Sequence, residues 1–151
     1  MKTKEFKNKY YRKVEGMLYN YKTIKAEIKN IDLEIEDIKS EYNGCTAIGY
    51  EEKSAPTNKF NSSVENEAVN REKQIKYFEN LRDSKQRLID KIDNALETLT
   101  YRELDIVRLR YFDKISNQEV AKQIDLTEQR VCEIKSNVIN RLIDLVIINK
   151  V

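Results

Sequence analysis

The residues that could perform acid–base, nucleophilic or metal chemistry are few in this chain and poorly spaced. The 151 residues include no histidine and only two cysteines, Cys45 and Cys132, which are far apart. Without imidazole there is no Ser–His or Cys–His nucleophile, and without a CxxC pair or a Cys/His cluster no zinc site is expected. Neither GxxxxGK[ST] nor GxGxxG is present, and neighbouring acids such as Glu51 and Glu52 are usually solvated. We therefore expect no enzyme, no metal and no cofactor.

The composition favours a helical protein in water. The chain is 36% charged and 40% hydrophobic, with three glycines and one proline, and its mean hydropathy is −0.73. The aliphatic content exceeds that of a disordered tail, and no apolar run is long enough to cross a bilayer. Because helix breakers are scarce, we expect an all-α fold. No apolar segment follows the basic N-terminus as it would in a secretory signal, so we expect a cytoplasmic protein without a membrane partner.

An apolar seam with alternating steps of four and three runs through residues 10–42 and predicts one unbroken amphipathic helix of roughly 50 Å. Its members are Tyr10, Val14, Met17, Tyr21, Ile24, Ile28, Ile31, Ile35, Ile38 and Tyr42. Such a helix needs a long partner, and the mixed flanking charges favour an antiparallel hairpin within the chain over a parallel coiled coil. The seam residues expected to carry oligomerisation are Tyr21, Ile24, Ile28, Ile31, Ile35 and Ile38.

The period disappears over residues 43–61, where glycine, proline, threonine and asparagine cluster. This predicts an irregular loop longer than most helix–helix connections. Ser62 followed by Glu65 predicts the capped start of a second long helix. Arg71 and Lys85 interrupt the apolar spacing of that helix, and they either extend along the edge of the hairpin or mark where a further subunit packs.

Three short-range signals for helix starts follow in quick succession. Thr100 with Glu103 is a capping-box pair that opens a helix through about residue 112, and Ser116 with Glu119 opens a helix of two turns. Thr127 is a good N-cap for a longer helix. The sequence therefore predicts three closely spaced helices at the C-terminal end.

The connection at residues 124–127 is short, and the apolar spacing around it is typical of a helix-turn-helix. The apolar set is Val120, Ala121, Ile124, Leu126, Val131 and Ile134. A helical hairpin that only packs a core would show the same spacing, so the pattern alone leaves DNA binding open. We expect two domains: a long helical hairpin over 1–99 for oligomerisation or interaction, and a three-helix module over 100–151.

The C-terminal third also carries a resemblance. The stretch LTYRELDIVRLRYF (99–112) resembles the start of region 4 of bacterial sigma factors, and SNQEVAKQIDLTEQRVCEIK (116–135) is similar to its helix-turn-helix. The T-x-R-E opening, the R-L-R-Y helix end, the E-V-A-K-x-I helix, the L-T turn and the R-V-x-x-I helix occur in the same order and register. The resemblance implies a DNA-binding module.

The rest of the chain does not resemble a complete sigma factor. It has no tryptophan and places a heptad helix where a sigma factor has its promoter-melting region. A helical N-terminal part, an irregular middle and a terminal region-4-like module resemble the small phage late-gene activators of the ArpU and RinA type. That resemblance implies sequence-specific binding to double-stranded DNA and activation of phage genes through host RNA polymerase. Two alternatives stay open: a small terminase subunit that recognises a packaging site, and a polymerase- or sigma-interacting protein that does not bind DNA itself.

The sigma resemblance also implies roles for individual residues. It gives the base-reading positions to Glu128, Gln129 and Glu133. Gln129 suits adenine, whereas the two glutamates would accept from cytosine amino groups, so the target differs from an ordinary sigma-factor element. Cys132 either allows close approach to DNA by its small size or acts as a redox switch. Further contacts to DNA are expected from Ser116, Lys122, Thr127, Arg130, Lys135, Asn137, Arg102 and Arg108, although each arginine or lysine among them can instead be an ordinary exposed charge.

The net charge of the C-terminal module is low for a DNA-binding protein. Residues 100–151 hold nine basic and eight acidic residues, a net charge of +1, which is weak for neutralising several phosphates. The first 13 residues hold six basic residues and one acidic residue, a net charge of +5. This arm either supplies the missing attraction or is a solvated helix start. Two weak modules on one assembly bind better than one, and residues 142–148 are unusually apolar, so we expect a homo-oligomer.

Overall fold

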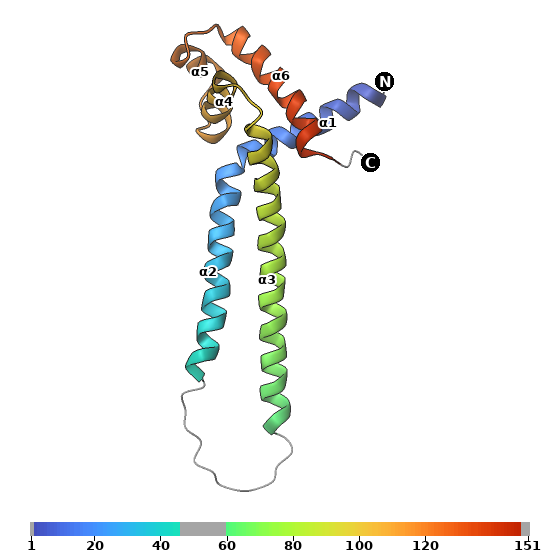
Figure 1. Cartoon of the computed structure of the whole chain (residues 1–151), viewed down its shortest axis with the longest axis vertical. Coiled ribbons are helices and arrows are strands. Elements are labelled where there is room, and N and C mark those ends of the chain that lie inside the picture. Colours follow the sequence, from blue (N-terminus) through green and yellow to red (C-terminus); the bar gives the residue numbers. More distant parts are fainter. Residues whose placement is uncertain (1, 46–59, 149–151) are drawn as a thin grey trace. The chain divides into compact units, whose positions relative to one another are not determined.

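The computed structural model describes residues 2–45 and 60–148, and the side chains of residues 8–41 and 65–148. Every regular element in these ranges is a helix, which confirms the all-α prediction. The elements are α1 (Lys2–Tyr19), α2 (Tyr21–Cys45), α3 (Phe60–Leu96), α4 (Tyr101–Val107), the π-helical turn η1 (Arg108–Phe112), α5 (Asn117–Gln123) and α6 (Glu128–Val146) (Figure 1). None of the described helices is both long and apolar enough to span a membrane.

The chain divides into two compact units. The first, here called the discontinuous unit, combines Met1–Lys25 with Arg87–Val151, and the second, the hairpin unit, is Ala26–Gln86. The expected domain boundary after residue 99 therefore differs from the division in the structure. The reason is that α1 and the end of α3 bury their apolar faces in the same core as α6.

The predicted unbroken helix over residues 10–42 is wrong, because α1 ends at Tyr19 and α2 begins at Tyr21. The buried positions of α1 are Tyr10, Val14 and Leu18, which follow successive steps of four. A 3.5-residue seam would instead turn toward Met17. The apolar seam thus contributes to two different cores. The helix is interrupted at Asn20, between the residues that pack in the discontinuous unit and those that pack in the hairpin unit.

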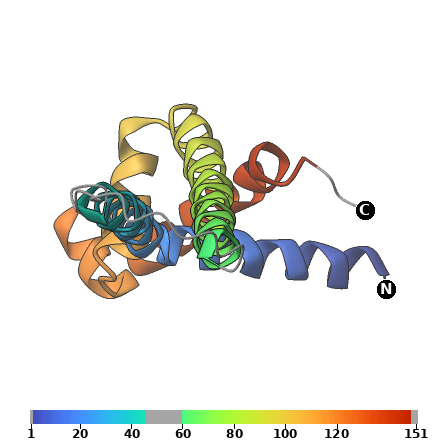
Figure 2. The ribbon, with the colours of Figure 1, turned by 90° about the horizontal axis from the view of Figure 1, so that it is seen from below.

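The main core of the discontinuous unit lies between α1, the end of α3, η1 and α6. In Figures 1 and 2, α1 (blue) and the second half of α6 (red) are neighbours. The fully or nearly buried members are Tyr10, Val14, Leu18, Ile92, Ala95, Leu96, Val107, Tyr111, Val138, Ile139, Leu142, Ile143, Val146 and Ile147. Because α1 supplies three of them, it is part of the unit that contains the three C-terminal helices.

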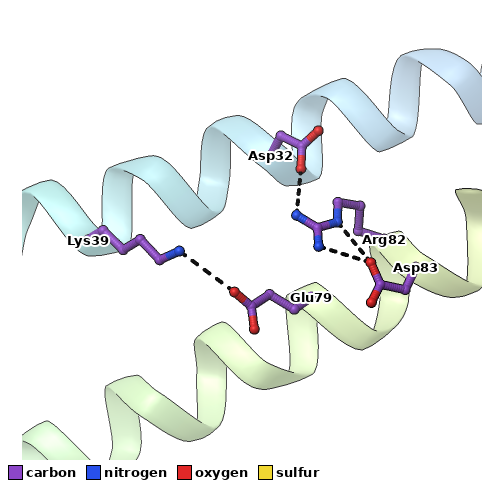
Figure 3. Close-up of polar contacts among 5 residues, drawn as sticks. All are labelled: Asp32, Lys39, Glu79, Arg82 and Asp83. Carbon is purple, nitrogen blue, oxygen red and sulfur yellow. Dashed lines mark hydrogen bonds and ion pairs between the residues drawn. The ribbon is translucent and has the colours of Figure 1, made fainter.

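The hairpin unit pairs α2 with α3 in antiparallel order. Ile28 and Ile35 of α2 are buried. The partners of Glu27, Asp32 and Lys39 on α3 are Lys85, Arg82 and Glu79, at 2.8, 3.3 and 3.6 Å. As the residue number rises along α2, the number of its partner on α3 falls, which establishes the antiparallel register. Figure 3 shows the last two pairs, with Arg82 also held by its neighbour Asp83.

The two cations that interrupt the apolar spacing of α3 are engaged within the chain. Lys85 reaches across to Glu27, and Arg71 pairs with Glu67 one turn earlier at 3.0 Å. The predicted loop over 43–61 falls mostly on residues 46–59, which lie outside the described part. Because α3 begins at Phe60, it starts two residues before the expected cap at Ser62, whose side chain also lies outside the described part.

Candidate nucleic-acid interface

Hydroxyl caps begin each of the three C-terminal helices, as the sequence predicts. Thr100 and Glu103 form a complete capping box: the Glu103 N–H donates to the Thr100 hydroxyl at 3.4 Å, and the Thr100 N–H donates to the Glu103 carboxylate at 2.9 Å. Ser116 accepts from the Glu119 N–H, and Thr127 accepts from the Arg130 N–H, both at 3.2 Å. These bonds satisfy amides that have no partner in the first turn of a helix, so they fix where each helix begins.

The Glu103 carboxylate also holds the last helix. Burial raises the pKa of this carboxyl, but the hydrogen bonds from the Thr100 backbone N–H, the Arg141 guanidinium and the Thr100 hydroxyl outweigh burial, and the net pKa is lowered. Arg141 lies on α6 and reaches Glu103 at 2.8 Å. The first cap of the module is therefore tied to α6.

The turn between α5 and α6 has the geometry of a helix-turn-helix. Asp125 adopts the left-handed conformation, with φ of 53°. Aspartate is among the few residues besides glycine that tolerate this conformation. The Leu126 N–H donates to the Ala121 carbonyl at 2.9 Å and closes the turn. A separate core of Ile106, Val120, Ala121 and Val131 holds α4, α5 and α6 together.

One exposed stripe runs along α6 on the side away from the core. Gln129, Glu133 and Asn137 are exposed and follow one another at steps of four, and the exposed Arg130 stands three residues before Glu133, which places all four on one face. Asn140 is exposed and continues the same stripe, although it lies beyond the sequence motif, which ends at Lys135. Its spacing of three from Asn137 and seven from Glu133 was the available signal. Glu128 is also exposed, in the first turn of α6.

Arg130 and Glu133 neutralise each other on this stripe. The Arg130 guanidinium donates to the Glu133 carboxylate at 2.6 Å, and both side chains are more than half exposed. Exposed ion pairs of this kind are weak, about 0.5 kcal/mol. A phosphate or a base edge can therefore replace either partner at little cost.

Lys135 does not lie on the exposed stripe. Its side chain is only 16% exposed, and its ammonium group lies 3.5 Å from the carboxylate of Glu15 on α1. The same carboxylate accepts a hydrogen bond from the Tyr111 hydroxyl at 2.6 Å. Burial and this hydrogen bond raise the pKa of Tyr111. Lys135 thus serves to attach α1 to α6, which its position in the sequence motif did not reveal.

The remaining cations expected at DNA lie at the surface. Lys122 is exposed and lies 3.6 Å from Glu119 within α5, and Arg102 and Arg108 are exposed on α4 and η1. Ser116 and Thr127 are exposed as well and are engaged as caps. The structure therefore places Lys122, Arg102 and Arg108 where solvent, or DNA, can reach them.

Cys132 faces α5. It is half-buried, and the side-chain amide of Asn117 donates to its sulfur at 3.3 Å. Its small side chain lets α5 approach α6 closely, which is a packing role. In the described residues, no group of three acidic, histidine or cysteine side chains is placed to hold a metal ion.

The residues proposed for oligomerisation are wholly or partly buried by contacts within the chain. The Tyr21 ring stacks on Phe112, with ring centres 4.4 Å apart, and its hydroxyl donates to Asp93 at 2.6 Å. Ile28 and Ile35 are buried, while the other members, Ile24, Ile31 and Ile38, are half-buried. The half-buried edge is the part of the seam that a second copy can still cover, so oligomerisation stays a prediction.

Residues 95–143 match the family model described as Sigma-70, region 4. The match begins at the end of α3 and includes α4, η1, α5 and most of α6, so it covers both capped helices of the helix-turn-helix and their turn. Comparison with curated proteins and with solved structures gave no match. The matched region is a helix-turn-helix of the DNA-binding, regulatory kind, and the exposed stripe of α6 lies within it.

Proposed function

We propose that the protein is a sequence-specific transcription regulator, a phage late-gene activator that works with host RNA polymerase. The observation that carries this proposal is the exposed stripe of α6, which stands on a capped helix-turn-helix inside the sigma-70 region 4 match. The stripe offers amide and carboxylate groups to a DNA groove. Its placement on the second helix of the motif is the arrangement by which such modules read the major groove.

The stripe provides a chemical basis for sequence preference. The Gln129 amide can bond both N7 and N6 of adenine, and the amides of Asn137 and Asn140 offer the same donor and acceptor pair. Glu133 accepts from a cytosine amino group once Arg130 has turned to a phosphate. Lys122, Arg102 and Arg108 supply contacts to the DNA backbone, which fix register and carry no sequence information.

The activator assignment rests on the region 4 match and on the hairpin unit outside it. Region 4 gives the class of DNA-binding module, and the hairpin gives a way to join copies. With so low a net charge in the module, two modules on one assembly gain the effective concentration that one lacks. The dimer or higher oligomer is part of the same proposal.

A selection of bound fragments from the source genome and from random DNA, at two salt concentrations, tests the function. Enrichment of one motif upstream of transcribed genes supports the activator, whereas enrichment at a packaging locus supports a terminase subunit. On the selected motif, Gln129→Ala should relax preference at one or two base pairs by about 1–3 kcal/mol. Arg130→Ala should weaken binding to all sequences alike.

The matched control is Gln74→Ala, since Gln74 is an exposed glutamine on α3 of the hairpin unit. This variant should leave both the motif and the affinity unchanged. The same loss on every sequence for Gln129→Ala and Arg130→Ala would contradict base reading by the stripe. Absence of any enriched sequence at either salt concentration would contradict the function itself.

A further inference from the structure

The three C-terminal helices carry no net positive charge with which to attract DNA. Residues 100–148 contain eight basic and eight acidic residues, a net charge of zero. Half of those cations already have a carboxylate partner: Lys122 with Glu119, Arg130 with Glu133, Lys135 with Glu15, and Arg141 with Glu103. Affinity for DNA depends mainly on neutralised phosphates, so the module needs a second source of positive charge.

Helix α1 provides such a source within the same compact unit. Lys9, Arg12 and Lys13 are exposed, and their spacing places them opposite the buried residues Tyr10 and Val14. Among the side chains that the structure describes, no carboxylate pairs with any of the three. The basic face of α1, which we define as Lys9, Arg12 and Lys13, is therefore exposed and has no carboxylate partner among the described side chains.

The only acidic residue between positions 8 and 25 is Glu15, and its charge is used internally. Its carboxylate holds the Tyr111 hydroxyl at 2.6 Å and lies 3.5 Å from the Lys135 ammonium group. Glu15 thus fastens α1 to α6, and its charge is not available to the basic face. The same contacts give α1 a fixed place relative to the recognition helix.

That place is beside the second half of α6. The hydroxyls of Tyr11 and Ser136 are 3.4 Å apart. Ser136 follows Glu133 by three residues, which is about 4.5 Å along the helix axis. Tyr11 and Glu15 both make polar contacts from α1 to α6. Arg12 follows Tyr11 directly and stands three residues before Glu15, so it lies next to the side of α1 that faces α6. The basic face therefore begins within about one helical turn of the base-reading stripe.

We propose that α1 is a second DNA-contacting helix, whose Lys9, Arg12 and Lys13 bind phosphates that flank the site read by α6. This inference rests on the proposed function, because it needs α6 to face DNA. The exposed stripe of α6 sets the sequence preference, and α1 supplies most of the non-specific affinity for DNA. Helix α1 thereby gives a net-neutral helix-turn-helix the charge that its own surface lacks.

The test uses the full chain and a mixed-sequence DNA duplex of about three helical turns, with binding followed by fluorescence anisotropy from low to moderate salt. Lys9→Gln, Arg12→Gln and Lys13→Gln together should lower affinity about tenfold or more at low salt. They should also reduce the slope of log K against log salt by about 2 to 3, near 0.9 for each phosphate. Loss should be equal on the selected motif and on random DNA.

The matched control removes three exposed lysines from the hairpin unit, Lys29, Lys73 and Lys76, also by substitution with glutamine. It changes net charge by the same amount and should leave affinity within about twofold. Circular dichroism melts should coincide for all three proteins, since every substituted side chain is exposed. Equal losses in both triple variants would overturn the proposal, because the attraction would then come from net charge alone.

The remaining outcomes separate this proposal from the function on which it rests. Normal DNA binding by the wild type, unchanged in affinity and salt slope by the α1 substitutions, would overturn the role of α1 and leave the regulator intact. No DNA binding by the wild type would overturn both. An α1 variant that binds DNA normally but no longer binds phosphatidylglycerol vesicles would assign the basic face to a lipid surface instead.

Discussion

Different forces stabilise the interiors of the two units of the chain. In the discontinuous unit, Val14, Ile106, Val138 and Ile139 are at most 1% exposed, and aliphatic side chains fill two adjoining cores. Among the described residues of the hairpin unit only Ile28 and Ile35 are buried, and three ion pairs link the helices at half-exposed positions. One unit depends on apolar burial and the other largely on surface electrostatics.

This difference indicates which unit should be the more stable and which should open more easily. Burial of apolar groups is worth about 0.8 kcal/mol for each methylene and is not screened by salt as an ion pair is. Exposed ion pairs are worth much less and weaken as salt rises. We therefore expect the DNA-contacting unit to keep one shape while the hairpin opens more readily, which hydrogen exchange can resolve segment by segment.

The largest effect is expected from a charge in the shared core. Val14→Asp should destabilise the discontinuous unit by about 4 kcal/mol, because a buried carboxylate without a partner is costly. Urea unfolding followed by circular dichroism measures the loss, and DNA binding should disappear with it. Val69→Asp on α3, where Val69 is 47% exposed, is the control and should change stability little. A normal Val14→Asp protein would show that α1 does not belong to this unit.

Next in size is a cavity in the same core, compared with one in the hairpin. Leu142 is 1% exposed, and Leu142→Ala should cost about 3 kcal/mol. Ile31 is half-buried in the hairpin unit, and Ile31→Ala should cost about 1 kcal/mol, because less apolar surface returns to water. Exchange rates of amides in α6 and α2 report each loss in its own unit. Equal costs would remove the distinction between the two units.

The pH dependence of the discontinuous unit should depend on Glu103. Its folded pKa lies below the ordinary value of 4.5, so its contribution is complete above that pH and is lost as pH falls through the folded pKa. Glu103→Ala should cost about 1 kcal/mol near neutral pH by removing the cap and the Arg141 contact. The difference from wild type should shrink as the pH is lowered below 4.5. A difference that grows in acid would contradict this sign.

The smallest expected effect concerns the hairpin ion pairs. Lys85→Gln removes the 2.8 Å contact with Glu27 and should cost about 0.5 kcal/mol at low salt. The cost should approach zero in concentrated salt, where such pairs are screened. Exchange protection in α2 and α3 at both salt concentrations is the measurement. A cost that is independent of salt would show that Lys85 acts through the packing of its methylene groups.

Local signals predicted more of this molecule than long-range ones. The caps at Thr100, Ser116 and Thr127 depend on residues three positions apart, so the sequence displays them directly. The helix-turn-helix follows from those caps and from apolar spacing. The outward face of α6 was equally readable, apart from Asn140.

What the sequence did not reveal depends on residues distant along the chain. The pairing of Lys135 with Glu15 requires α1 to lie on α6, and nothing near Lys135 indicates this. The interruption at Asn20 arises because two different cores divide one seam, whereas the periodicity of the segment is continuous. The grouping of residues 1–25 with 87–151 is a tertiary fact of the same kind.

The discontinuous unit also has a consequence for how the protein folds. Tyr11 and Ser136 are 125 positions apart, so α1 must wait for nearly the whole chain to be synthesised before its core can close. The cost in entropy of closing a loop rises with the logarithm of its length. Because the Glu27–Lys85 contact brings the two ends of the inserted segment together, a hairpin that forms first shortens the loop that remains. Formation of the less stable hairpin unit should thereby speed the folding of the discontinuous unit. Substitutions that destabilise the hairpin should slow that folding, although they change no residue of the helix-turn-helix.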